Sequence, residues 1–381
     1  MKPQWRELLA LGSAYSLATA VFNIAPLLIG VLISLVGLME EQAGLLMTLE
    51  LVAMSMVAFI LAPWGSLFSN KSVLLLSVVM ALATNTLAAA TSSYEILIGL
   101  RILAGISGGF LLLAVNTRIA ANAEPVRLYG LVMVATTIVG AILLALIPEL
   151  VSSFGISGAY GTLALLCAIM VPLVALMPEL RTHASSKMSN NKQALSKSHF
   201  QVVMLLSAVF LVQFAQSGFY SFSERFGVES IGLSTKEMGL LLAIGYLGAI
   251  PGSALAAWLG YRFGRLSPLL LSLLIFALSV NVAVFTDHRL VFSIAFIALN
   301  FSYFFSIPYQ LGIAADLDHT GKLASASIGV FFFGLAGGPY LGGSLVSNFD
   351  YASLAISINF AVAMGIGIYM WVQSSGEVPQ T

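Results

Sequence analysis

The sequence predicts an all-α membrane protein whose twelve transmembrane helices form two six-helix bundles, with both termini in the cytoplasm. Three observations lead to this prediction: an apolar composition, twelve long apolar runs, and basic residues gathered on one side of those runs. Of the 381 residues, 59% are hydrophobic and only 8% are charged, whereas a soluble protein carries about 25% charged residues. A water-facing surface needs more charge than this, so the composition excludes a soluble enzyme and a disordered chain.

The twelve apolar runs are each long enough for a helix that crosses the hydrocarbon core of a membrane, which takes roughly 20 residues. They are continuously apolar and do not alternate with polar residues, so they indicate helices and not barrel strands. The first run is too long for the apolar part of a signal peptide, and we expect it to remain as a helix. The predicted spans are 8–37, 43–68, 71–91, 94–118, 127–152, 157–178, 200–224, 234–260, 267–286, 290–314, 322–347 and 351–374.

The basic residues divide unevenly between the two sides of the predicted membrane. With a cytoplasmic N-terminus, only Arg225, Lys236 and Arg289 of the 16 lysines and arginines fall in outer segments, and Arg101 falls within a span. All the others lie on the cytoplasmic side, as the positive-inside rule requires. An even number of spans then places both termini in the cytoplasm. Short loops without added domains are typical of bacterial proteins of the inner (plasma) membrane, where we expect this protein.

A polar segment divides the chain into two halves. Residues 179–199 are rich in Ser, Asn and Lys, and they predict a cytoplasmic linker between an N-terminal bundle, 1–178, and a C-terminal bundle, 200–381. A short internal repeat supports the division, because EQAGLL at 41–46 opens the second span and KEMGLL at 236–241 opens the eighth. Two parallel six-helix halves are one known way to build a secondary transporter.

The loop after the eighth span carries a family motif. The segment AWLGYRFGR at 257–265 is similar to the loop motif G-x-L-x-D-R-x-G-R of the major facilitator superfamily, with Arg262, Gly264 and Arg265 in place. Tyr261 stands where that family usually has Asp. In the family this loop latches the inward-closed state through charges, so the missing Asp puts that latch in doubt.

Two motifs of the first half extend the resemblance, which covers essentially the whole chain. The segment GSLFSNK at 65–71 keeps Gly65 of the loop motif and again lacks the Asp. The fourth span holds RILAGISGG at 101–109, in which Arg101 is followed four residues later by Gly105, as in the fourth helix of the family. The resemblance therefore implies the major facilitator fold.

The eleventh span carries the run GLAGGPYLGG at 334–343. Its Gly334, Gly338, Pro339 and Gly342 match a pattern that the family, and its antiporters especially, place in the fifth helix. Here the pattern lies in the equivalent helix of the second half, which weakens the inference of antiport. Glycines at four-residue spacing also let helices pack closely, and a proline kinks a helix, so close packing or hinging is the main alternative.

Two ionisable residues lie inside predicted spans, where charges are costly and usually functional. Glu50 and Arg101 each lie seven residues from the outer end of their span, in helices that are neighbours in the family. We therefore expect the two side chains to meet as an ion pair. A carboxylate paired with arginine stays ionised, and one that faces an apolar cavity favours the proton, so the pair is a candidate for proton coupling. A static pair that fixes helix register is the alternative.

Uncharged polar residues mark a candidate substrate cavity, which the resemblance places among the first, fourth, seventh and tenth helices. Gln213, Gln216 and Tyr220 recur at three- and four-residue steps and so share one helical face. Each polar residue also fits as a link between helices. Asn85 and Asn281 lie in helices that are peripheral in the family, and we expect them to be packing residues. The candidate cavity residues are Asn23, Asn116, Gln213, Gln216, Tyr220, Asn300 and Tyr303.

The seventh span ends on Glu224 and Arg225, at the predicted outer surface. The two residues fit an extracellular gate pair. The commoner outcome for such neighbours is an exposed helix cap of little energetic value, and this is what we expect.

Several other functional classes find no support in the sequence. There is no phosphate-binding loop for an ATPase, and the four histidines show no metal-binding spacing. Cys167 is the single cysteine, which excludes an intramolecular disulfide. The net charge is zero and the basic residues form no stripe, so nucleic acid is not an expected partner. We expect no metal and no cofactor.

The resemblance implies a secondary active transporter that works by alternating access, similar to bacterial drug-efflux members, and not an enzyme. We expect a monomer in the lipid bilayer that exports small organic or amphiphilic molecules. Protons are the expected coupling ion, because Glu50 is available and no cluster of oxygen ligands for Na⁺ is evident. Two alternatives remain open: uptake of a sugar or amino acid by symport or facilitation, and a membrane sensor or scaffold that transports nothing.

Overall fold

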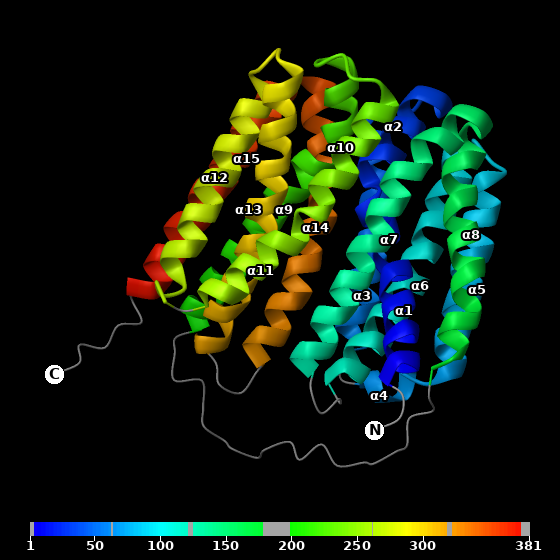
Figure 1. Ribbon diagram of the computed structural model, residues 1–381, viewed down its shortest axis with the longest axis horizontal. Helices are drawn as coiled ribbons and strands as arrows, with labels where there is room; N and C mark the ends of the chain where they lie inside the picture. The colour runs from blue at the N-terminus through cyan, green and yellow to red at the C-terminus, as the bar shows by residue number, and fades with distance from the viewer. Residues whose placement is uncertain are drawn as a thin grey trace.

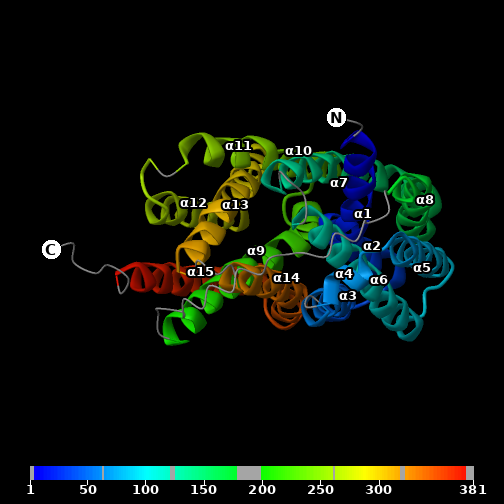
Figure 2. The same cartoon turned by 90° about the horizontal axis from the view of Figure 1, so that it is seen from below.

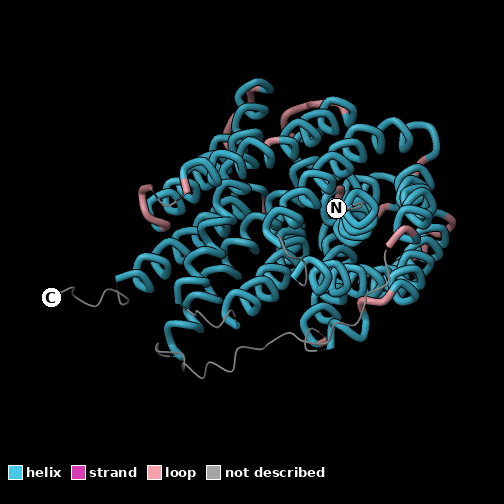
Figure 3. Tube along the Cα trace, turned by 60° about the horizontal axis from the view of Figure 1, so that its bottom comes forward, coloured by secondary structure: helices cyan, strands magenta, loops and turns pink. Residues whose placement is uncertain are grey.

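Almost all of the described chain is helical. The computed structural model describes residues 4–61, 64–120, 125–177, 199–260, 262–317 and 322–374. Short loops join the helices (Figure 3). The helices are α1 (Gln4–Asn23), α2 (Ala25–Val36), α3 (Glu40–Ile60), α4 (Gly65–Phe68), α5 (Lys71–Ala89), α6 (Tyr94–Ala120), α7 (Pro125–Phe154), α8 (Ile156–Ala175), α9 (His199–Glu229), α10 (Thr235–Leu247), α11 (Ala249–Leu259), α12 (Leu266–Val284), α13 (Arg289–Leu317), α14 (Lys322–Asn348) and α15 (Tyr351–Ser374).

The helices agree with the predicted membrane spans. Among the described residues, eleven spans are long and apolar enough to cross a membrane, and the bent pair α1–α2 brings the number to twelve when it counts as one span. This confirms the predicted all-helical class with eleven to twelve candidate transmembrane helices. The largest differences are at two ends: the second predicted span ends early, at Ile60 of α3, and α9 continues to Glu229. The predicted linker, apart from His199 at the start of α9, and Tyr261 lie outside the described residues.

A proline causes the break inside the first span. Helices α1 and α2 meet at an angle of 47°, and Pro26 occupies the first turn of α2. Proline has no backbone N–H, so the carbonyl of Phe22 loses its partner within the helix. The backbone around Asn23 is thereby opened to contacts from other helices.

The two halves of the sequence lie on opposite sides of the molecule. Figure 2 shows α1–α8 on one side and α9–α15 on the other, with α7 beside α10 and α3 beside α14. Helix α1 begins and α15 ends at the lower end of the molecule in Figure 1. The connections α2–α3, α9–α10 and α14–α15 lie at the opposite end, which we call the upper end.

The halves pack against each other mainly through three helix contacts, α3 with α14, α7 with α10, and α2 with α9. Apolar side chains from both sides form one continuous buried cluster there, which includes Leu28 and Met47 of the N-terminal half and Phe219 and Leu242 of the C-terminal half. On the surface of this contact, Lys236 of α10 and Glu149 of α7 form an ion pair at 2.5 Å. The packing holds the two halves together towards the upper end.

The repeated sequence segment supplies one glycine to each of the first two crossings. A Cβ atom on Gly44 of α3 would stand 2.2 Å from the carbonyl oxygen of Pro339 in α14. A Cβ atom on Gly239 of α10 would stand 2.4 Å from Cγ of Pro148 in α7. Small residues let helix backbones approach this closely. The internal repeat therefore marks the two equivalent contacts between the halves, each of them a glycine against a proline-containing helix.

The proline of α14 also opens that helix to hydrogen bonds from its neighbours. Pro339 cannot donate to the carbonyl of Leu335, and Ser217 of α9 donates to this oxygen at 2.5 Å instead. At the following residue, Thr48 of α3 donates to the carbonyl of Ala336 at 2.7 Å and accepts from the backbone N–H of Tyr340 at 3.1 Å. Thr48 thus links the two halves next to the glycine crossing.

The glycine crossing gives a direct test of the packing. We expect Gly44→Leu to lower the stability of the purified protein by about 1–3 kcal/mol, because the new side chain forces α3 away from α14. Thermal unfolding in one detergent measures the difference. Gly99→Leu is the matched control, since a Cβ atom on Gly99 meets nothing within 4 Å. Equal melting temperatures for the two variants would contradict the close approach.

Candidate functional site

Glu50 and Arg101 lie together inside the N-terminal half, as the sequence predicts. Nη1 of Arg101 donates to Oε2 of Glu50 at 3.1 Å, and Arg101 is fully buried while Glu50 is 7% exposed. The motif glycine brings their helices together, because a Cβ atom on Gly105 would stand 2.2 Å from the backbone oxygen of Glu50. Arg101 lies one turn before Gly105 on α6 and therefore reaches the carboxylate on α3.

Two further side chains complete the surroundings of the arginine. Nη2 of Arg101 donates to Oδ1 of Asn85 at 3.1 Å, and the guanidinium lies over the ring of Tyr160 at 4.7 Å from its centroid. We call Glu50, Asn85, Arg101 and Tyr160 the Arg101 cluster. The prediction that Asn85 only packs was wrong, because α5 turns its amide towards the arginine. Nε of Arg101 and the hydroxyl of Tyr160 are buried without a hydrogen-bond partner in the described chain.

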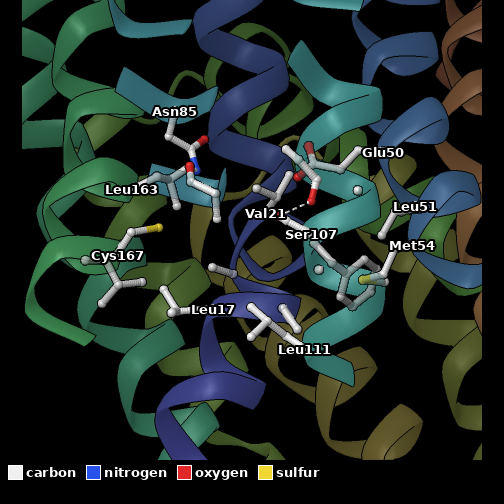
Figure 4. A pocket seen from close by; sticks show the side chains of 18 residues that line it. Leu17, Val21, Glu50, Leu51, Met54, Asn85, Ser107, Leu111, Leu163 and Cys167 are labelled. Carbon is white, nitrogen blue, oxygen red and sulfur yellow. Dashed lines mark hydrogen bonds between the residues drawn. The ribbon is translucent and has the colours of Figure 1, made fainter. Parts of the chain in front are cut away.

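A small cavity adjoins the Arg101 cluster (Figure 4). Its volume is about 20 Å³, and a single water molecule needs roughly 10–15 Å³. Glu50, Asn85 and Cys167 point into it, and Leu17 and Val21 of α1 close it on another side. The cavity therefore has room for one water beside the carboxylate.

The C-terminal half contains a buried network of uncharged polar groups. The hydroxyl of Tyr303 donates to Oε1 of Gln213 at 2.7 Å, and Nε2 of Gln213 donates to Oε1 of Gln310 at 3.2 Å. Tyr369 also donates to Gln310 Oε1, and Gln310 Nε2 donates to Ser306. These five residues join α9, α13 and α15, and we call them the Gln213 network.

Gln216 lies next to this network and differs from it. The side chain is 3% exposed, and its Oε1 has no hydrogen-bond partner among the described residues. It borders a narrow cleft that is also lined by Tyr303 and Ser306. Gln216, like Ser221, is therefore a buried polar residue of α9 whose oxygen is free to accept a new donor.

The other predicted cavity residues are dispersed. Tyr220 donates to the backbone oxygen of Asn23 at 2.6 Å, at the α1–α2 break. Asn300 donates to the carbonyl of Phe296 in its own helix, and Asn116 is half-buried on α6. In this conformation Gln213, Gln216 and Tyr303 lie together, and the remaining residues do not join them in one cavity.

The predicted motif glycines serve helix packing. On α14, Gly334 approaches the backbone oxygen of Phe210, and Gly338 approaches the backbone nitrogen of Gly218. Gly342 and Pro339 continue this contact on either side, towards α9 and α3 respectively. The alternative of close packing thus accounts for the whole run.

The loop motifs also have structural roles. Gly264 adopts φ 71°, a left-handed conformation that suits glycine in a tight turn. The guanidinium of Arg262 lies over the ring of Trp258 at 5.2 Å, and Arg265 packs against Gly312 of α13. In the first-half copy, Gly65 packs against Thr117 of α6.

Glu224 departs from its predicted role. Arg225 pairs with Glu229 at 2.6 Å, and Glu224 is buried, with an exposed fraction of 6%. The prediction of an exposed cap was wrong, because α9 continues past the predicted end of the span and α2 covers this part of it.

Sequence reasoning missed Tyr160, Ser306, Gln310 and Tyr369. Tyr303, Ser306 and Gln310 follow one another at three- and four-residue steps, the same signal that singled out the α9 face, and this spacing identifies them. Tyr160 and Tyr369 offer no such signal. Within the described ranges, no three His, Cys, Asp or Glu side chains are grouped so that they could hold a metal ion.

Solved structures of transporters share this fold. A bacterial homologue of the human lysosomal transporter Spinster, in an inward-facing and occupied conformation, is 15% identical with a TM-score of 0.74, over 98% of each chain. The nucleoside transporter NupG is 14% identical with a TM-score of 0.77, over 97% of this chain and 99% of its own. The human organic anion transporter MFSD10 (TETRAN) is 16% identical with a TM-score of 0.67, over 98% and 100%.

A search of curated proteins finds no matching relative. The sequence itself, however, matches a family over most of its length. The model of the Major Facilitator Superfamily matches residues 10–338. The chain therefore belongs to the Major Facilitator Superfamily and is a membrane transporter by fold, not an enzyme.

Proposed function

We propose that the protein is a proton-coupled secondary transporter that exports small organic or amphiphilic molecules by alternating access. The two halves act as two bundles that rock about the contacts between them. The upper end faces the outside, and the termini lie in the cytoplasm, in agreement with the distribution of basic residues. The protein works as a monomer in the inner membrane.

The observation that carries the proposal is the Arg101 cluster with its cavity. A buried arginine needs a negative partner, and Glu50 at 3.1 Å is its only ion-pair partner among the described residues. A water in the cavity would bring protons to Glu50. Protonation removes the balancing charge, and it then favours a conformation in which another acceptor or water reaches Arg101. This dependence of conformation on a proton is what coupling requires.

Helix α3 links this chemistry to the movement of the halves. Glu50 lies two residues after Thr48, which bonds to α14 of the other half, and six residues after Gly44. A change at Glu50 therefore acts on the same helix that forms the crossing with α14. This connection supports alternating access and not a rigid scaffold.

The polar groups of the interior support a substrate without strong charge. The Gln213 network and Gln216 offer amides and hydroxyls, and none of these side chains carries a charge near neutral pH. A strong anion would need several arginines or lysines. We therefore propose a neutral or weakly cationic amphiphile whose donor groups bond to Gln216.

Replacing the carboxylate tests the proton coupling. We expect Glu50→Gln to reduce proton-driven transport at least ~tenfold, equal to about 1.4 kcal/mol, and to remove its dependence on the pH gradient. Proteoliposomes with an imposed gradient and a panel of neutral and weakly cationic amphiphiles measure this. Glu95→Gln, at an exposed carboxylate of α6, is the control. A Glu50→Gln variant that keeps wild-type rate and pH dependence would refute the role. If substrate accumulates inside right-side-out vesicles, the direction of transport is uptake and not export.

A double-mutant cycle separates coupling from a purely static pair. We expect Arg101→Met alone to destabilise the protein by about 3–5 kcal/mol, because it leaves Glu50 buried without a partner. The pair Glu50→Gln with Arg101→Met should recover most of that stability and still show no pH-gradient dependence. Unfolding in detergent and transport in vesicles are the two readouts. Full transport by the stable double variant would leave the pair with a structural role only.

The unpartnered amide of α9 gives a test of the substrate site. We expect Gln216→Leu to raise the KM for substrate about three- to tenfold, the effect of one lost hydrogen bond of about 0.5–1.5 kcal/mol, without loss of stability. Asn281→Leu is the contrasting control, because Asn281 exchanges hydrogen bonds with Asn359 at 3.1 and 3.0 Å. That variant should lose stability and keep its KM. If Gln216→Leu keeps its KM and Asn281→Leu raises it, the substrate binds away from Gln216.

A further inference from the structure

A buried carboxylate lies at the contact between the two halves, away from the Arg101 cluster. Glu224 of α9 is 6% exposed, and its side chain is directed at Gly30 of α2. A Cβ atom on Gly30 would stand 2.1 Å from Oε2 and 3.2 Å from Oε1 of Glu224. The absent side chain at position 30 thus makes room for the carboxylate of the other half.

No opposite charge is bonded to this carboxylate. Within the part of the chain that the structure describes, no ion pair or hydrogen bond reaches Glu224, and α2 carries no ionisable side chain. The charged neighbours on its own helix are Arg225 and Glu229, which pair with each other. From the other helices, Tyr351 of α15 is the nearby titratable group, with Glu40 of α3 beyond it.

One turn before Glu224, the same face of α9 also contacts the segment between α1 and α2. Tyr220, four residues before Glu224, donates to the backbone oxygen of Asn23. Tyr220 and Glu224 therefore both reach across to the first span of the other half. An opening of the upper end would separate α9 from α2 and admit water to Glu224.

We propose that Glu224 is a second proton-binding site of the transporter, distinct from Glu50, and that it controls closure of the outer end. An unpaired ionised carboxylate is very costly to bury, whereas a protonated one is not. Closure therefore requires a proton, taken from the outer water, and opening returns that proton to the outer water as α2 withdraws. The inference rests on the proposed alternating access and makes acidic outer pH favour the closed outer end.

A distance measurement on the full chain tests this without any substrate. Cys167 is replaced by Ala, and spin labels are placed at Ser92 and Asp287, two exposed residues in upper loops of opposite halves. Electron–electron resonance in nanodiscs then gives the distance between about pH 5 and pH 9. We expect the ratio of open to closed outer end to rise with pH by up to ~tenfold per pH unit, the limit for one proton.

The variants decide the outcome. Glu224→Gln should hold the outer end closed, with its ratio constant to within about twofold across the same range, because its amide carries no ionisable proton. Glu224→Asp keeps a titrating carboxylate and should keep a pH-dependent distance, which preserves the test if the Gln variant fails to fold. Glu95→Gln, an exposed carboxylate at the same end, should keep the parent profile.

Three results would overturn the proposal: a parent distance that does not change with pH, a Glu224→Gln variant with the parent profile, or loss of the profile in Glu95→Gln. The measurement needs neither substrate nor gradient. Absence of transport in vesicles would therefore refute the proposed function while the pH-dependent distance still stood, and the two failures are distinguishable.

Discussion

The close approach of glycine to proline-containing helices at two crossings is the constraint on which the arrangement of the halves depends. In hydrocarbon, apolar surfaces gain little by leaving lipid for one another, so helices associate through close packing and a few hydrogen bonds. Gly44 and Gly239 allow that packing at equivalent positions, against Pro339 and Pro148. A small number of polar contacts accompany this packing, among them the hydrogen bonds of Thr48 with α14 and of Tyr220 with Asn23, and the ion pair of Lys236 with Glu149. Packing contacts of this kind fix the register of the facing helices, and the two halves can separate at a modest cost in free energy.

Close packing within a half has a different consequence from close packing between halves. Gly105 holds α6 against the backbone of Glu50 on α3, so these helices move as one unit and carry the ion pair with them. Rocking alone does not break the contact between Glu50 and Arg101. In the proposed mechanism the access of water to the cavity beside them is what changes, and α1 borders this cavity through Leu17 and Val21. The α1–α2 break at Pro26 lies only a few residues further along the same span.

Apolar runs were enough to predict the spans, and the equal depth of Glu50 and Arg101, together with the family resemblance that makes their helices neighbours, predicted their contact. Both follow from the cost of polar groups in hydrocarbon, which acts along the chain. The partners Asn85 and Tyr160 could not be predicted in the same way, because uniformly apolar helices carry no period that says which face meets which neighbour. Glu224 was misplaced for a related reason. Helix α9 continues beyond its apolar run to Glu229. Polar residues in that extension can be buried by neighbouring helices, although their hydropathy predicts that they are exposed.

The two buried carboxylates differ in the movement that each can sense. Glu50 has a bonded cation, Arg101, in its own half. Under our proposal it responds to the entry of a proton and of water within that half. Glu224 has no bonded cation, because the adjacent Arg225 pairs with Glu229, and it is covered by α2 of the opposite half. Under our proposal its environment changes when the halves separate at the upper end. In the mechanism that we propose, one proton is therefore coupled to events inside a half and another to the position of the halves. The placement of the carboxylates, more than their number, is what assigns these separate tasks.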